Sequence, residues 1–136
     1  MYEVRVTADF AAAHFLKDYN GKCENLHGHN YKVYAHVRGE ELNEGGMLLD
    51  FSLLKKALRT VTARLDHTNL NDLACFRQNP SAERIAVYIF DGIIAELNGM
   101  GLDLRWEQGK KSAFLYAVDV FETDSSRARY APHPLY

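Results

Sequence analysis

Hydrophobic and polar residues alternate over the first fifteen positions of the chain. One parity carries apolar side chains and ends in a histidine: Tyr2, Val4, Val6, Ala8, Phe10, Ala12 and His14. This period of two predicts a strand over residues 2–15 with one buried and one solvated face. After a polar loop over residues 17–26, the alternation returns from about His27 to Arg38. The shared face of this second strand contains His27, His29, Tyr31, Val33, Ala35 and Val37.

The period then changes to that of a helix between Phe51 and Leu65. Its apolar stripe consists of Leu54, Ala57, Leu58, Val61 and Leu65. Asp50 is well placed as the N-cap. A second helix is predicted to begin near residues 79–81, with Pro80 in its first turn, and to end at residues 98–99. A charged connection over residues 99–112 leads to a strand over 113–123 and a short strand over 126–131.

The order strand–strand–helix–helix–strand–strand predicts an α+β fold in a single domain over residues 1–136. The expected sheet has four antiparallel strands, with both helices on one face. A small sheet of this kind has exposed edges, so we expect the sheets of different subunits to join.

Composition narrows the classes of function. The 136 residues are 47% hydrophobic and 25% charged, which is ordinary for a globular protein. Sixteen Lys and Arg against eighteen Asp and Glu give a net charge of −2, which argues against nucleic acid as the main partner. No apolar run approaches the roughly 20 residues that span a bilayer, and the start is not typical of a signal peptide. With only two cysteines, we expect a soluble cytoplasmic protein with reduced thiols.

Three of the six histidines lie on the predicted buried faces. His27 and His29 are two residues apart, so both imidazoles leave the same side of a strand. If this strand pairs with the first one as a hairpin, His14 joins them in one layer. Three neutral imidazoles suit zinc and leave its fourth position open, although hydrogen-bonded or surface histidines are the alternative. We expect His36 and His133 to be exposed.

Cys23 lies in the predicted loop beside Lys22, four residues before His27. A nearby cation favours the thiolate, which can act as a nucleophile or general base. A fourth metal ligand or an ordinary loop cysteine is the alternative. Cys75 is expected to be a packed side chain without a role.

Two acidic positions also stand out. Asp66 precedes His67 at the end of the first predicted helix, and such a pair can fix the tautomer that a proton relay requires. Local capping of a helix end is the alternative. Glu122 ends an apolar row that runs through Phe114, Tyr116, Val118 and Val120. A carboxylate there needs a donor, either an arginine or a ligand with adjacent N–H groups.

Together these segments resemble the tetrahydropterin synthases of the tunnelling fold, which include 6-pyruvoyl- and 6-carboxytetrahydropterin synthases. The matching segments cover nearly the whole chain in family order: FAAAHFL, CENLHGHNYKV, LLDFSLLK, LDHTNLN, NPSAERIAVYIF and VFETDSSRARY. The family's zinc ligands match three histidines, His14, His27 and His29. Its catalytic cysteine matches Cys23, its Asp–His pair matches Asp66 and His67, and its pterin-anchoring glutamate matches Glu122. Ser81 stands where the family often has the first of two hydroxyl residues beside the pterin, and Ala82 replaces the second.

The resemblance implies 7,8-dihydroneopterin triphosphate as substrate, zinc as cofactor, and Cys23 as the base with Asp66–His67 as its relay. It also implies a homo-oligomer, a hexamer of two trimers, whose sheets form a barrel with sites between subunits. Three residues separate Cys23 from His27. The bacterial 6-carboxytetrahydropterin synthases of queuosine synthesis have the same spacing, so we expect this chain to belong to that branch. FETD and HGHNYKV resemble the pyruvoyl branch, which is the alternative within the family. Outside the family, the residues would also suit a structural zinc module closed by Cys23, or a metal hydrolase.

Overall fold

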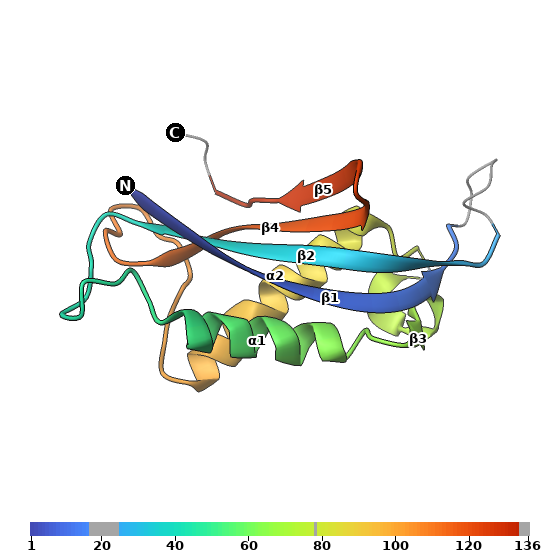
Figure 1. Ribbon diagram of the computed structural model, residues 1–136, viewed down its shortest axis with the longest axis horizontal. Coiled ribbons are helices and arrows are strands. Elements are labelled where there is room, and N and C mark those ends of the chain that lie inside the picture. The colour runs from blue at the N-terminus through green and yellow to red at the C-terminus, as the bar shows by residue number, and fades with distance from the viewer. Residues whose placement is uncertain (17–24, 78, 134–136) are drawn as a thin grey trace.

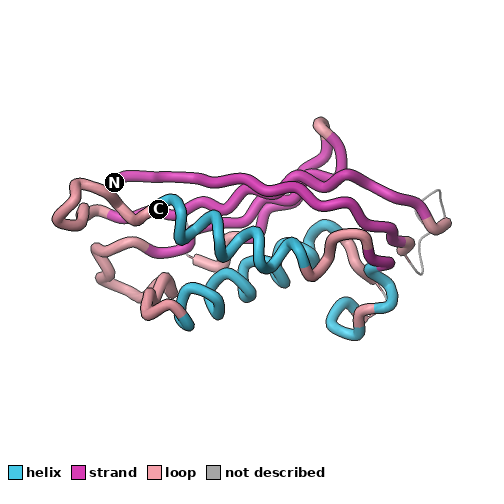
Figure 2. The backbone as a smooth tube through the Cα atoms, turned by 60° about the horizontal axis from the view of Figure 1, so that its bottom comes forward, coloured by secondary structure: helices cyan, strands magenta, loops and turns pink. Residues whose placement is uncertain are grey.

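The computed structural model describes residues 1–16, 25–77 and 79–133 as one sheet covered by two helices (Figure 1). The strands are β1 (Tyr2–His14), β2 (His27–Gly39), β3 (Thr68–Asn69), β4 (Phe114–Thr123) and β5 (Ser126–Tyr130). The helices are α1 (Phe51–Ala63) and α2 (Ala82–Gly99), with two short 3-10 helices between them at Leu70–Asp72 and Ala74–Phe76. Both α-helices lie against the same face of the sheet, which confirms the predicted α+β class (Figure 2).

The sheet has the strand order β3-β1-β2-β4-β5. β1 and β2 form an antiparallel hairpin that runs in unbroken register from Tyr2 opposite Gly39 to His14 opposite His27. The four predicted strands are all present. The structure adds β3, which pairs in parallel with β1 over two residues and is too short for periodicity to reveal.

Side-chain caps and close packing determine where the helices lie. The Asp50 carboxylate accepts a hydrogen bond from the Ser52 amide at 2.8 Å, which confirms the predicted N-cap of α1. Ser81 caps α2, so that Pro80 precedes the helix instead of occupying its first turn as predicted. A Cβ atom at Gly92 of α2 would lie 2.8 Å from Val61 of α1. The helices therefore approach each other where α2 has no side chain.

The apolar row predicted along β4 is interrupted. The register between β2 and β4 shifts at Tyr116, where β4 contains one extra residue. Phe114 and Tyr116 therefore pack with Trp106 in a small separate cluster, while Val118 and Val120 belong to the main core. The prediction of one continuous face was wrong at its start, because a β-bulge changes which side successive residues occupy.

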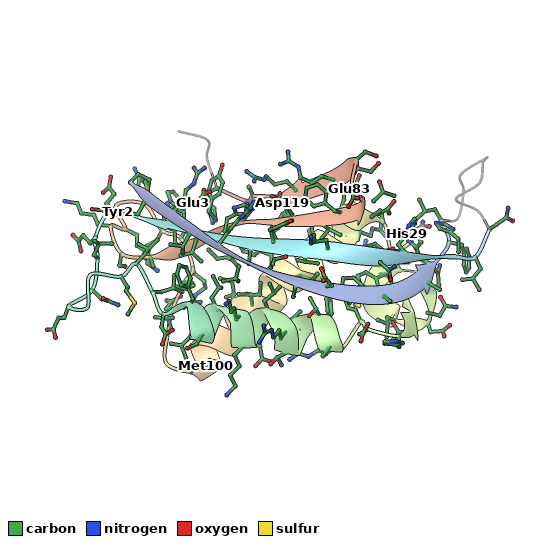
Figure 3. All side chains as sticks on the ribbon, in the orientation of Figure 1. Tyr2, Glu3, His29, Glu83, Met100 and Asp119 are labelled. Atoms are coloured by element: carbon green, nitrogen blue, oxygen red, sulfur yellow. The ribbon has the colours of Figure 1, made fainter. Side chains whose placement is uncertain are left out.

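The face of the sheet opposite the helices carries a buried polar network. His36 Nε2 lies 2.8 Å from a carboxylate oxygen of Asp119, and Arg129 donates two hydrogen bonds to the same carboxylate. Glu3 lies 3.5 Å from the other ring nitrogen of His36, and Figure 3 shows Glu3 and Asp119 on the side away from the helices. The expectation that His36 is exposed was wrong, because these charged partners cover it.

Other expectations about single side chains were also wrong. The His133 ring is partly buried beside Phe114, and its Nε2 lies 2.7 Å from the Leu115 carbonyl oxygen. Cys75 is exposed on its short helix instead of packed. Within the described residues, the helices are too short or too polar to cross a lipid bilayer.

We expect Asp119→Asn to lower the free energy of unfolding by about 3 kcal/mol at pH 7, since it leaves Arg129 and His36 without their anion. Burial alone would raise the pKa of Asp119, but hydrogen bonds from Arg129 and His36 outweigh it and hold this pKa below its ordinary value. The stabilisation is therefore present above the carboxyl's unfolded-state pKa and is lost as the pH falls through the lower folded-state pKa.

Urea unfolding at pH 7 and pH 3, at one protein concentration, measures this effect. The difference in free energy of unfolding between wild type and Asp119→Asn should be smaller at pH 3 than at pH 7. Asp103→Asn is the matched control, because Asp103 also binds an arginine, Arg105, but both side chains are exposed. Equal losses of unfolding free energy in the two variants would contradict the assignment of this stabilisation to the buried network.

Candidate functional site

Three imidazoles meet where the β1–β2 hairpin ends, on the helix-facing side of the sheet. His14 and His27 are direct partners in the register, and His29 is the partner of Ala12 on the same face. The ring centroids lie 4.5 to 5.1 Å apart, and one ligand atom from each ring lies within 4.8 Å of the others. The predicted convergence of these three residues is confirmed, and Figure 3 shows His29 at this end of the sheet.

Backbone carbonyl groups orient two of the rings. His14 Nδ1 lies 2.8 Å from the carbonyl oxygen of Pro80, and His27 Nδ1 lies 2.6 Å from that of Asn25. If each Nδ1 carries the proton, each Nε2 presents a lone pair, as in metal-binding histidines held by a second shell. His14 Nε2 and His29 Nε2 are buried without a hydrogen-bond partner in the described residues. This set of donors fits a zinc ion.

Burial lowers the pKa of His29, and the nearby Glu122 carboxylate offsets only part of this effect. The imidazole therefore favours its neutral form, which is the form that binds a metal. In the described residues, the group able to hold a cation contains these three histidines. Three protein ligands leave a position open, which is typical of catalytic zinc and not of structural zinc.

Glu122 lies beside this group. Its two carboxylate oxygens are 3.8 Å from His14 Nε2 and 3.9 Å from His29 Nε2. The register between β4 and β5 shifts between Phe121 and Thr123, so Glu122 occupies a β-bulge. Bulges are common beside active sites. Glu122 faces the histidines from a third strand, on the side of the sheet where Val118 and Val120 belong to the main core.

Glu122 also borders a pocket with Ser81 at the N-terminus of α2. The pocket is about 260 Å³ and is lined by Leu16, Ser81, Ala82, Glu83, Glu122, Ser126, Arg127 and Ala128. Figure 3 places Glu83 at the same end of the molecule as His29. A carboxylate and a hydroxyl at one edge of a small pocket can bind a flat ligand with adjacent N–H groups.

Asp66 and His67 form the expected pair, but not at this group. His67 Nδ1 lies 2.8 Å from one Asp66 oxygen, and the other Asp66 oxygen accepts a hydrogen bond from the Ala11 amide at 2.9 Å. The Ala11 amide and then His67 lower the pKa of Asp66. His67, which has a φ of 57°, in turn donates its amide to the Ala11 carbonyl oxygen. Both residues are thus fastened to β1.

His67 lies outside the three-histidine group. It is 83% exposed and borders a hollow that Ala13, His29 and Asn30 also line. Ala13 and Asn30 alternate with His14 and His29 along the strands, so their side chains point to the opposite face of the sheet. Within the described residues, the group of converging ligand atoms contains His14, His27 and His29 and does not include His67.

Cys23 lies outside the described residues, so its predicted role stays a prediction. Sequence reasoning missed Tyr31, although the alternation of β2 places this residue on the histidine face. The Tyr31 hydroxyl is buried without a hydrogen-bond partner in the described residues. Burial and then the charge of Glu122 raise the pKa of Tyr31 far above its ordinary value, so that it stays a neutral donor. The signal was a polar atom at a core position two residues from His29.

Comparisons with known proteins match these features. A family described as 6-pyruvoyl tetrahydropterin synthase matches residues 3–133. The chain is 41% identical over 121 residues to a 6-pyruvoyl tetrahydrobiopterin synthase of Drosophila melanogaster, with 85% of this chain and 65% of that protein covered. It is 38% identical over 126 residues to a 6-carboxy-5,6,7,8-tetrahydropterin synthase of Synechocystis sp., with 89% and 86% covered. The solved structure of Caenorhabditis elegans 6-pyruvoyl tetrahydropterin synthase superposes with a TM-score of 0.78 at 27% identity, with 97% and 96% covered.

Proposed function

This chain belongs to the 6-pyruvoyl tetrahydropterin synthase family, and from that premise we propose that it is a zinc-dependent 6-carboxy-5,6,7,8-tetrahydropterin synthase. Family membership by itself supports a lyase-type enzyme of pterin metabolism. The proposed reaction converts 7,8-dihydroneopterin triphosphate and one water molecule to 6-carboxytetrahydropterin, acetaldehyde and triphosphate. Its product would serve queuosine and related deazapurine synthesis in the cytoplasm, where a catalytic thiol stays reduced.

The observation that carries the proposal is the convergence of His14, His27 and His29 beside a carboxylate. The three Nε2 atoms would hold the zinc ion, and two of them are buried without another partner. Bound there, zinc would supply Lewis acidity toward the side-chain hydroxyl groups of the substrate. Glu122 would accept two N–H bonds from the aminopyrimidinone edge of the pterin, with Ser81 as a further contact in the same pocket.

Proton transfer is assigned to Cys23 and to the Asp66–His67 pair. Cys23 precedes His27 by four residues, so the same chain supplies the thiol and the three histidines. As a thiolate, Cys23 would remove a proton from the substrate side chain. Asp66 holds His67 through a hydrogen bond to Nδ1, which leaves Nε2 free to exchange protons with the base.

The position of His67 supports a site built by two chains. His67 is exposed and is not part of the three-histidine group, so we propose that a neighbouring copy presents its own Asp66–His67 pair to this site. The edge strands β3 and β5 leave unpaired backbone groups through which sheets can join. We propose a hexamer of two trimers with sites between subunits.

The choice of the carboxy product rests on the short spacing between Cys23 and His27. The Drosophila and Synechocystis relatives carry the two different names at 41% and 38% identity, so overall similarity favours neither product decisively. The pyruvoyl reaction, in which triphosphate is eliminated without loss of acetaldehyde, is the second candidate. A structural zinc module would need Cys23 as the fourth ligand and gives no reason for Glu122 to face the histidines.

Incubation of the zinc-loaded protein with 7,8-dihydroneopterin triphosphate, followed by mass spectrometry, tests the proposal. Acetaldehyde together with 6-carboxytetrahydropterin is the expected result. A 6-pyruvoyl product without acetaldehyde would move the protein to the other branch. Unchanged substrate, with zinc bound through four protein ligands, would overturn the catalytic assignment and leave the structural one.

A further inference from the structure

The Tyr31 hydroxyl is a polar group in the interior of the protein. Tyr31 has 0% of its surface exposed, and its hydroxyl oxygen has no hydrogen-bond partner among the described residues. A buried hydroxyl in this state lowers stability, because it has lost water without gaining another partner. Phenylalanine would fill nearly the same space without that loss. The hydroxyl therefore contributes nothing to the unliganded fold that its ring does not already provide.

The surroundings of Tyr31 are those of the metal site. Its ring stacks on Phe10 with the centroids 4.7 Å apart, which determines the orientation of the ring. The ring also meets His29 and His14 edge to face, at 5.4 and 5.9 Å between centroids. The Glu122 carboxylate lies within 3.9 Å of both of these histidines.

Zinc accounts for only some of the unpartnered atoms here. The buried side-chain atoms without a partner in the described residues are His14 Nε2, His29 Nε2, His36 Nδ1 and the Tyr31 hydroxyl. A metal ion would satisfy the first two, and Glu3 lies near the third. The remaining hydroxyl has a proton to donate, which a cation does not satisfy. Since no described residue accepts this hydrogen bond, an acceptor that enters the site with the ligand fits it.

We propose that Tyr31 is a further substrate-binding residue, whose hydroxyl donates a hydrogen bond to a side-chain oxygen of the bound pterin next to the three histidines. This inference rests on the proposed function. It assigns Tyr31 to the hydroxylated side chain of the substrate, whereas Glu122 holds the ring edge. The pairing forms only in the complex, which explains why no described residue accepts a hydrogen bond from this hydroxyl.

Tyr31→Phe separates the two roles of the residue, since it keeps the ring and removes only the hydroxyl. We expect the variant to bind as much zinc as wild type. Its folding equilibrium constant should be equal to that of wild type or higher. Tyr34→Phe is the matched control, because Tyr34 lies on the same strand and faces the opposite side of the sheet. A fall of tenfold or more in the folding constant of Tyr31→Phe alone would show a structural hydroxyl and overturn the inference.

Ligand binding is measured with zinc-loaded protein, neopterin, and 6-methylpterin, which lacks side-chain hydroxyl groups. Tyr31→Phe should raise the Kd for neopterin about threefold to tenfold and leave that for 6-methylpterin unchanged. Glu122→Gln should raise the Kd for both ligands. The inference would be overturned if Tyr31→Phe and wild type had the same Kd for neopterin, or if Tyr31→Phe raised the Kd values for both pterins equally. Either result would leave the proposed function standing. Failure of the wild type to bind either pterin would instead overturn the proposed function.

Discussion

Replacing His27 with alanine is expected to remove the bound zinc and to lower turnover by a factor of about 10³, because the Lewis acid and its position are lost together. His27 is the best of the three ligands for this test, since it is less buried than His14, and its truncation perturbs the core less. Elemental analysis of the purified variant and initial rates with 7,8-dihydroneopterin triphosphate measure the two effects.

His67→Ala is the control for this experiment. We expect it to lose activity to a similar degree while it retains one zinc per chain, because His67 is not among the three histidines whose ligand atoms converge. The two variants therefore distinguish a residue that binds the metal, His27, from one that relays protons, His67. Full zinc content in His27→Ala, or loss of zinc in His67→Ala, would show that the metal is held by a different set of residues.

Mixing two inactive variants is expected to restore activity if each site draws on two chains. Cys23→Ala and His67→Ala should each lower turnover by about 10²- to 10⁴-fold, the usual contribution of a general base or acid. After the two are unfolded and refolded together in equal amounts, about a quarter of the sites in a closed oligomer would receive an intact Cys23 from one chain and an intact His67 from its neighbour. Initial rates before and after mixing measure the recovery.

A second mixture provides the matched control. Cys23→Ala mixed with His27→Ala should stay inactive, because each site takes both residues from the same chain. Recovery in both mixtures would place Cys23 and His27 on different chains. Recovery in neither mixture, with hexamers present by size-exclusion chromatography and light scattering, would argue that Cys23 and His67 act within one chain.

Local sequence patterns were sufficient for most elements of the fold. Alternation determines which side of a strand each residue occupies, and this was enough to assign His14, His27 and His29 to one layer. The predicted cap at Asp50 depends on a few neighbouring residues, and the structure has it, whereas the cap of α2 lies at Ser81, after the Pro80 that was predicted in the first turn. The two-residue strand β3 escaped prediction, because its pairing with β1 is a contact between distant segments.

The sequence by itself therefore determined the order of the elements and the composition of the three-histidine group. Only the tertiary structure decided which elements meet. The bulge at Tyr116 divides the row along β4, the charged partners bury His36, and the packing of β4 beside β2 brings the Glu122 carboxylate within 3.9 Å of two histidines. Attachment to Ala11 holds His67 apart from the three-histidine group. Periodicity specifies a side within one element, whereas distances between elements depend on register and packing, which no short stretch of sequence encodes.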